Sequence, residues 1–359
     1  MLYAVNPLSL VQSIVGPAMH IPDGYLSPLS AAVMYALALP FWYLASQKVR
    51  RALTTRMVPV IALFAAFSFV IMMFNIPLPG GTTGHAVGGT LAAIILGPWA
   101  SVIAISIALA IQALFFGDGG ILAFGANAFN MAIVLPFVGY YIYRLISGAS
   151  APTSSRRVVA AAMAGYVALN VAAVLTAVEF GVQPYFFKAA DGTPLYNPYG
   201  LNVAIPAMMS GHLLIAGLAE ALITGLVVAY LQRANLPLLQ LSRPEVVARA
   251  APGWRGVRAL WIGLATLVVL TPLGLLASGT AWGEWGLTEL RDEQGLGFIP
   301  QGLARWGERW SAPLPDYAVP GLGQVPGYVL SAVAGIALIA VAVWLISRAL
   351  ARRQPQAEG

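Results

Sequence analysis

The chain has 359 residues, of which 59% are hydrophobic and 9% charged, whereas roughly a quarter of the residues in a soluble domain are charged. This composition, with a mean hydropathy of +0.79, predicts an all-α polytopic membrane protein. The absence of cysteine excludes disulfides and thiolate metal sites, and we interpret the net charge of +6 as the Lys/Arg bias of cytoplasmic loops rather than a nucleic-acid surface.

Residues 1–18 form an N-terminal extension that we expect to be removed or not translated. Gly16 and Ala18 are typical of the small residues before a cleavage site, and Met19 is itself a candidate initiator. The extension is followed by the motif Met19-His20-Ile21-Pro22-Asp23-Gly24. Loss of the extension would free the α-amine of Met19 beside the His20 imidazole, which places two nitrogen donors next to each other.

Apolar runs predict membrane spans over residues 27–45, 57–76, 86–116, 124–143, 158–178, 208–231, 259–276 and 325–346. The run 86–116 is too long for one crossing and short for two. A turn at Gly97-Pro98 splits it into two helices and places all the basic clusters on the same side as Lys48 and Arg50. We therefore expect about nine transmembrane helices, with the N-terminus outside and the C-terminus inside. The short arm 86–96 should be buried in protein.

The composition also divides the chain. We expect a seven-helix core over residues 19–232, a basic cytoplasmic linker over 233–258, and a two-helix region over 259–359. Residues 77–89 are too rich in Gly and Pro to be helical throughout, and this loop should place His85 on the outer side with His20.

These histidines suggest a metal site built from nitrogen donors, which suits Ni(II), Co(II) or Cu(II) better than Mg²⁺ or Ca²⁺. Two alternatives stay open. One is a membrane metalloenzyme using His20, His85 and His212, with Asp23 as the base, and the other is a proton-coupled secondary carrier using His212 and Glu220.

Three segments in order carry a resemblance to a known family: Met19-His20-Ile21-Pro22-Asp23-Gly24, then Asn75-Ile76-Pro77-x-Pro79-Gly80-Gly81-Thr82-x-Gly84-His85, then Gln112-Ala113-Leu114-x-Phe116-Gly117-Asp118-Gly119-Gly120. The region from Met19 to about Leu231 resembles the CbiM/NikM family, the substrate-binding components of energy-coupling factor transporters for cobalt and nickel. The last two spans resemble the small CbiN/NikN subunit.

The resemblance implies a square-planar site of four nitrogens. Its donors would be the Met19 amine, the backbone nitrogen and imidazole of His20, and the His85 imidazole. Around it we expect Asn75, Thr83, Gln112, Asn127 and His212. Ala32 and Ala36, which share a helix face, and the carboxyl of Glu220 are expected to contact a partner subunit.

The same resemblance implies a multi-pass protein of the prokaryotic inner membrane that is not an enzyme. It would capture Co²⁺ or Ni²⁺ as substrate, with cobalt slightly favoured as supply for cobalamin synthesis, and needs no organic cofactor. A CbiQ/NikQ-like coupling subunit and CbiO/NikO-like ATPases would drive release. The absence of a phosphate-binding P-loop in this chain agrees with that division of roles.

Overall fold

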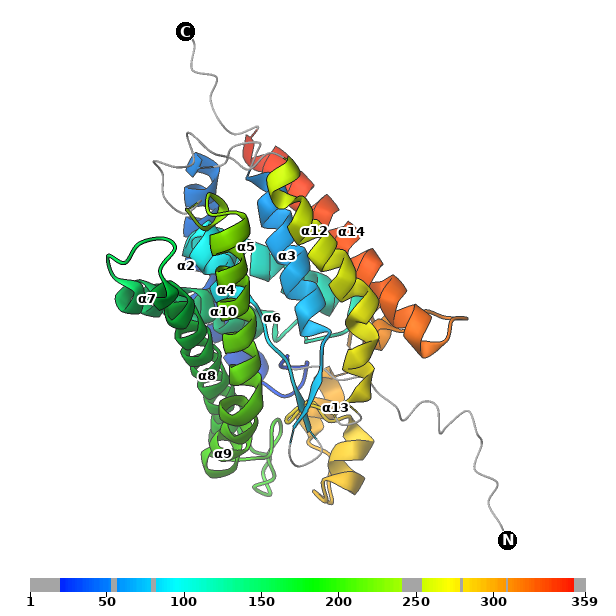
Figure 1. Cartoon of the computed structure of the whole chain (residues 1–359). Helices are drawn as coiled ribbons and strands as arrows, with labels where there is room; N and C mark the ends of the chain where they lie inside the picture. The colour runs from blue at the N-terminus through cyan, green and yellow to red at the C-terminus, as the bar shows by residue number, and fades with distance from the viewer. Residues whose placement is uncertain are drawn as a thin grey trace.

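The computed structural model describes residues 20–52, 57–78, 82–240, 254–277, 280–307 and 309–351. Within these ranges the chain is mostly helical and contains one two-stranded sheet (Figure 1). The helices are α2 (Pro28–Ala52), α3 (Val58–Met72), α4 (Gly89–Leu96), α5 (Pro98–Ile111), α6 (Phe124–Asn127), α7 (Leu135–Ser147), α8 (Ser155–Phe186), α9 (Leu201–Gly211), α10 (Gly217–Ala234), α12 (Trp254–Leu270), α13 (Gln301–Trp306) and α14 (Gln324–Ala351). Shorter turns of π or 3-10 type are η1 (Gln112–Phe116), η2 (Ala128–Val134), η3 (His212–Ala216), η4 (Leu238–Gln240), η5 (Thr271–Leu276), η6 (Glu289–Glu293) and η7 (Pro315–Tyr317).

The second span ends earlier than expected. Helix α3 stops at Met72, and the chain then forms strand β1 (Ile76–Leu78), which pairs antiparallel with β2 (Thr82–Gly84). Pro77 lacks a backbone N–H and cannot continue a helix, so an extended strand replaces the last helical turn. The hairpin returns the chain so that His85 directly follows β2.

The apolar run after the hairpin is two helices, as expected. Helix α4 has eight residues, all buried, and its length of about 12 Å is too short to cross a membrane. Gly97 has φ of +83°, a conformation that glycine adopts readily, and Pro98 starts α5 at the first helical position. The predicted turn at Gly97-Pro98 and the burial of the short arm are confirmed.

The segment between α12 and α14 is more than the outer loop expected from the sequence. It contains η6, α13 and η7. Its Trp285, Leu290 and Leu303 are buried in one hydrophobic cluster with Ile21 and Tyr25 from the N-terminal motif. Helices α12 and α14 pack along α3 on one flank of the molecule (Figure 1). The C-terminal region therefore contacts the core both through α12 and α14 and through the segment between them.

Seven helices in the described residues are long and apolar enough to cross a membrane. Together with the shorter apolar helix α3 and the buried short helix α4, these seven account for the nine helices expected from the sequence. The all-α polytopic membrane fold is thus confirmed. The C-terminal ends of α2, α10 and α14 lie at one end of the molecule with the start of α12 (Figure 1), and carry Arg50, Arg233 and Arg348. Which end faces the cytoplasm stays a prediction.

Helix α7 packs closely on α4 and positions this short helix, and a substitution at Gly139 tests the packing. A Cβ atom on Gly139 would overlap the side chain of Thr90. We expect Gly139→Ala to lower the free energy of unfolding by about 1–3 kcal/mol, the usual cost of overpacking, seen as a lower thermal midpoint in detergent. Gly263→Ala is the matched control, because an added Cβ there has no neighbour within 4 Å. An unchanged midpoint for Gly139→Ala would contradict the packing.

Candidate metal site

The two histidines predicted to bind metal lie side by side. Their ring centroids are 5.3 Å apart with an interplanar angle of 61°, and each residue is 1% exposed. A metal ion about 2 Å from one nitrogen of each ring would fit this separation. Met19, the third expected ligand residue, lies outside the described residues and directly precedes His20 in the sequence.

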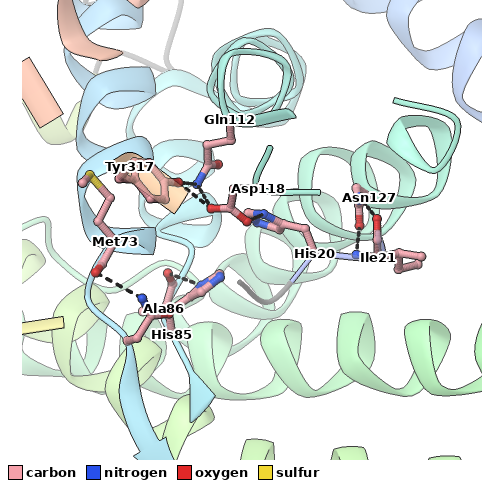
Figure 2. A network of polar contacts seen from close by, with 10 residues as sticks. His20, Ile21, Met73, His85, Ala86, Gln112, Asp118, Asn127 and Tyr317 are labelled. Carbon is pink, nitrogen blue, oxygen red and sulfur yellow. Dashed lines mark hydrogen bonds and ion pairs between the residues drawn. The ribbon is translucent and has the colours of Figure 1, made fainter. Parts of the chain in front are cut away.

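The carboxyl of Asp118 holds the His20 ring (Figure 2). Its Oδ1 lies 2.5 Å from Nδ1 of His20. Burial on its own raises the pKa of Asp118, but the charge of His20 and hydrogen bonds from His20 and Tyr317 together lower it below its usual value. The carboxylate is therefore ionised, and Nδ1–H donates to it. Nε2 of His20 is buried and has no hydrogen-bond partner among the described residues.

Two further groups hold Asp118 from the other side. Its Oδ2 accepts from Nε2 of Gln112 at 2.9 Å and from the hydroxyl of Tyr317 at 2.5 Å. Gln112 was expected near the site, and it lies there as an anchor of Asp118. Tyr317 and Asp118 were not predicted. Asp118 stands within one of the family-like motifs, where its glycine neighbours made it resemble a simple turn, whereas no local pattern marks Tyr317.

The backbone after His20 is clamped to the same loop. The side-chain amide of Asn127 accepts from the Ile21 nitrogen at 2.8 Å and donates to the Ile21 oxygen at 3.0 Å. The Asp23 carboxylate accepts from the backbone nitrogens of Ile121 and Ala123 at 3.1 and 3.0 Å. Gly119, with φ of +88°, leaves no room for a side chain against the His20 Cβ. Asn127 therefore fixes the backbone next to His20, and Asp23 acts as a structural clamp.

The loop that carries His85 is held from inside the membrane by Glu220 of α10. Glu220 is fully buried, and its Oε2 accepts from the backbone nitrogens of Val87 and Gly88 at 2.8 and 2.9 Å. A carboxylate at the start of α4 also suits the positive end of the helix dipole. The expectation that Glu220 contacts a partner subunit does not match this position, because the side chain faces the interior of its own chain.

The remaining expected neighbours lie near His85 without holding it. Thr83 and His212 line a small cavity of about 40 Å³ together with His85 and Glu284. Nδ1 of His212 lies 2.8 Å from the Met208 carbonyl oxygen of its own helix. Asn75 is buried and donates to the Met73 carbonyl oxygen at 3.4 Å.

Ala32 and Ala36 lie on the exposed side of α2. They share that side with Leu29, Val33 and Leu37, which are 65%, 49% and 46% exposed. This face is apolar and is not covered by the described part of the chain, so it is accessible to lipid or to another membrane helix.

Side chains alone do not complete a metal site here. Among the described residues, no three His, Asp or Glu side chains are grouped closely enough to hold an ion. Any ion shared by His20 and His85 therefore takes its other donors from elsewhere, such as backbone nitrogens or the chain before His20. Burial and the nearby His20 lower the pKa of His85 to about 3, so this imidazole is neutral at physiological pH and available as a ligand.

This low pKa predicts a pH-dependent stability. Between the folded pKa of about 3 and the unfolded value near 6.5, the unfolded chain binds the additional proton, so stability decreases as the pH falls through this window. We expect His85 to contribute a loss of up to about 1.4 kcal/mol per pH unit in metal-free protein. His85→Gln should show a shallower decline in denaturant midpoints measured from about pH 7 to about pH 4.5. Equal slopes for the two proteins would contradict the buried neutral histidine.

Comparison with known proteins identifies the family of the chain. A family profile described as “Cobalt uptake substrate-specific transmembrane region” (CbiM) matches residues 20–238, and a PDGLE domain profile matches residues 257–352. The chain is 54% identical over 351 residues to the fused nickel transport protein NikMN of Rhodobacter capsulatus, with 93% of this chain and 99% of the relative covered.

Similarity extends to a second fused protein and to a solved structure. The probable fused nickel transport protein LarMN of Lactiplantibacillus plantarum is 44% identical over 330 residues, covering 89% of this chain and 94% of the relative. A crystal structure of a transition metal transporter matches with a TM-score of 0.58 at 54% identity, covering 65% of this chain and 100% of that one. These relatives are named for transport, in line with the expectation of a protein that is not an enzyme. The chain belongs to the CbiM family of nickel and cobalt transport proteins and is a multi-pass membrane protein with a CbiN-like PDGLE domain at its C-terminal end.

Proposed function

We propose that this chain is the substrate-capture subunit of an energy-coupling factor transporter, and that it binds a nickel or cobalt ion on the outer side of the membrane between Met19, His20 and His85. The observation that carries the proposal is the buried pair of imidazoles, 5.3 Å apart between ring centroids. Asp118 orients one ring, and Glu220 holds the loop of the other. Buried nitrogen donors of this kind suit a late first-row divalent ion.

The proposed ligand set requires the His20 imidazole to flip by rotation about its Cβ–Cγ bond when the ion binds. A backbone nitrogen and an imidazole of the same residue reach one ion through Nδ1, because this closes a six-membered chelate ring. In the structure described above, Nδ1 contacts Asp118. After rotation about the Cβ–Cγ bond, Nε2–H would donate to Asp118 instead, the arrangement in which a carboxylate orients a ligating histidine. Binding would also release protons from the amine and the amide.

Nickel is the ion that we favour. The fused relatives that cover nearly the whole chain are named nickel transport proteins, which supports nickel over the cobalt slightly favoured from the sequence. Four nitrogen donors in a plane also suit nickel(II).

Release to the inside would need partners. We propose a CbiQ/NikQ-like coupling subunit and CbiO/NikO-like ATPases, with the exposed apolar face of α2 at Ala32 and Ala36 as the contact for the coupling subunit. Small residues one turn apart allow another helix to approach closely in lipid.

Neither alternative function gains support from the site. The Asp23 carboxylate is engaged by two backbone N–H groups, so it is poorly placed as the base of a metalloenzyme. Glu220 is engaged in the same way with Val87 and Gly88, which suits a structural clamp better than a proton carrier.

A pair of histidine substitutions tests the ligand assignment. His85→Ala removes one of two imidazoles from the proposed site, and we expect the purified full chain to lose specifically retained nickel. His212→Ala is the matched control, because its ring lines the same cavity but is not a proposed ligand. It should retain nickel close to one ion per chain, measured by elemental analysis after desalting. Full retention by His85→Ala would contradict the assignment.

The state of the Met19 nitrogen provides a second test. We expect a chain that starts at Met19 to bind nickel, because a free α-amine has a reference pKa of about 8 and loses its proton at little cost near neutral pH. A chain in which residues 1–18 stay attached presents an amide nitrogen instead and should bind at least tenfold more weakly in isothermal titration calorimetry. Equal affinities, with the termini verified by intact mass, would rule out the amine as a ligand.

A further inference from the structure

Tyr317 is a side chain of the C-terminal region that contacts the metal site. This residue lies in η7, far along the chain from His20, and is 3% exposed. Its hydroxyl donates to Oδ2 of Asp118 at 2.5 Å, while Oδ1 of the same carboxylate contacts Nδ1 of His20 at 2.5 Å. Figure 2 shows Tyr317 and His20 on opposite sides of Asp118. The Asp118 carboxylate therefore connects Tyr317, in the CbiN-like part of the chain, to the proposed ligand His20.

Several contacts fix the position of Tyr317. Its ring stacks on Phe116 of η1, with centroids 4.8 Å apart and an interplanar angle of 18°. Its carbonyl oxygen accepts from the Ser331 hydroxyl of α14 at 2.8 Å, and the backbone nitrogen of Leu314 donates to the Phe115 oxygen at 2.9 Å. The η7 turn is thereby bound both to α14 and to the segment that leads into Asp118.

The backbone at this point is unusual. Asp316 and Tyr317 have φ of +53° and +60°, and they are the described residues other than glycine with positive φ. Side chains with a Cβ rarely adopt this conformation, and it persists where surrounding contacts specify it. The turn is thus held in a form that directs the Tyr317 hydroxyl at Asp118.

We propose that Tyr317 is a positioning residue of the metal site: it fixes the Asp118 carboxylate and, through it, the His20 imidazole, so that the C-terminal region sets how tightly the ion is held. This inference rests on the proposed capture of nickel or cobalt by His20 and His85. Without the hydroxyl, Oδ2 of Asp118 keeps Gln112 as its one side-chain donor among the described residues, and Gln112 itself loses its contact with Tyr317. The carboxylate then has more rotational freedom, and the His20 ring is less well oriented for the ion.

The test compares two buried tyrosines in the full chain. Tyr317→Phe keeps the ring that stacks on Phe116 and removes only the hydroxyl. Tyr25→Phe is the matched control, because the Tyr25 hydroxyl also joins the two parts of the chain, through the Trp285 carbonyl oxygen at 2.7 Å, but does not contact Asp118. We expect Tyr317→Phe to weaken nickel binding by about 10-fold to 100-fold in competition titrations, the usual effect of losing an outer hydrogen bond at a metal site. Tyr25→Phe should stay within about threefold of the wild type, because it leaves the Asp118 contacts intact.

A double-mutant cycle with Asp118→Asn separates positioning from general loosening. If Tyr317 acts through Asp118, Tyr317→Phe should cost little further affinity in the Asp118→Asn background. The visible absorption band of bound nickel should keep its wavelength in Tyr317→Phe, because no ligand changes. Additive losses, a shifted band, or wild-type affinity in Tyr317→Phe would each overturn the proposal.

Two further variants distinguish a failure of the proposed role of Tyr317 from a failure of the proposed function. Ser331→Ala frees the Tyr317 carbonyl oxygen and should weaken binding in the same direction, which supplies the test if Tyr317→Phe does not fold. His85→Ala reports on the capture site itself. Loss of nickel in His85→Ala with full affinity in Tyr317→Phe and Ser331→Ala would refute only the role of Tyr317. Retention of nickel in His85→Ala would refute the proposed function.

Discussion

The contact between the Asp118 carboxylate and the His20 imidazole is the interaction on which the arrangement of the site depends. A buried carboxylate is costly unless it is well hydrogen-bonded, and Asp118 meets this requirement with His20, Gln112 and Tyr317. The His85 half of the site is held in a similar way, because buried Glu220 accepts hydrogen bonds from the backbone N–H groups of Val87 and Gly88, close to His85. Two buried carboxyl groups, one on each histidine segment, thus hold these segments in a defined geometry.

Much of the fold was predictable from the sequence because the membrane limits the choices. Hydropathy located the spans, and the distribution of basic residues required the turn at Gly97-Pro98 that the structure contains. Placing His20 and His85 on the same side of the membrane suggested a metal site, and the family resemblance implied that both bind the ion. Asn127 and Gln112 were expected near the site, although the group that each one holds, the Ile21 backbone and Asp118, follows from the structure.

Other features depend on tertiary contacts that leave no local pattern. Asp118 lies among glycines, which indicate a turn but do not reveal that its carboxylate faces inward onto His20. Tyr317 stands in a segment that hydropathy marks only as a loop, and its role arises from docking on Phe116 and Asp118. Glu220 was expected to contact a partner subunit, whereas its hydrogen-bond donors are the backbone N–H groups of Val87 and Gly88, which no side-chain pattern reveals.

X-ray absorption at the nickel edge on the loaded, purified full chain tests the central claim most directly, because it reports the atoms bound to the ion. A shell of four nitrogens in a plane, with scattering from two imidazoles, is the result expected for the Met19, His20 and His85 site. Oxygen ligands in the first shell, or scattering from three imidazoles, would contradict it and indicate a site that includes Glu284 or His212 instead.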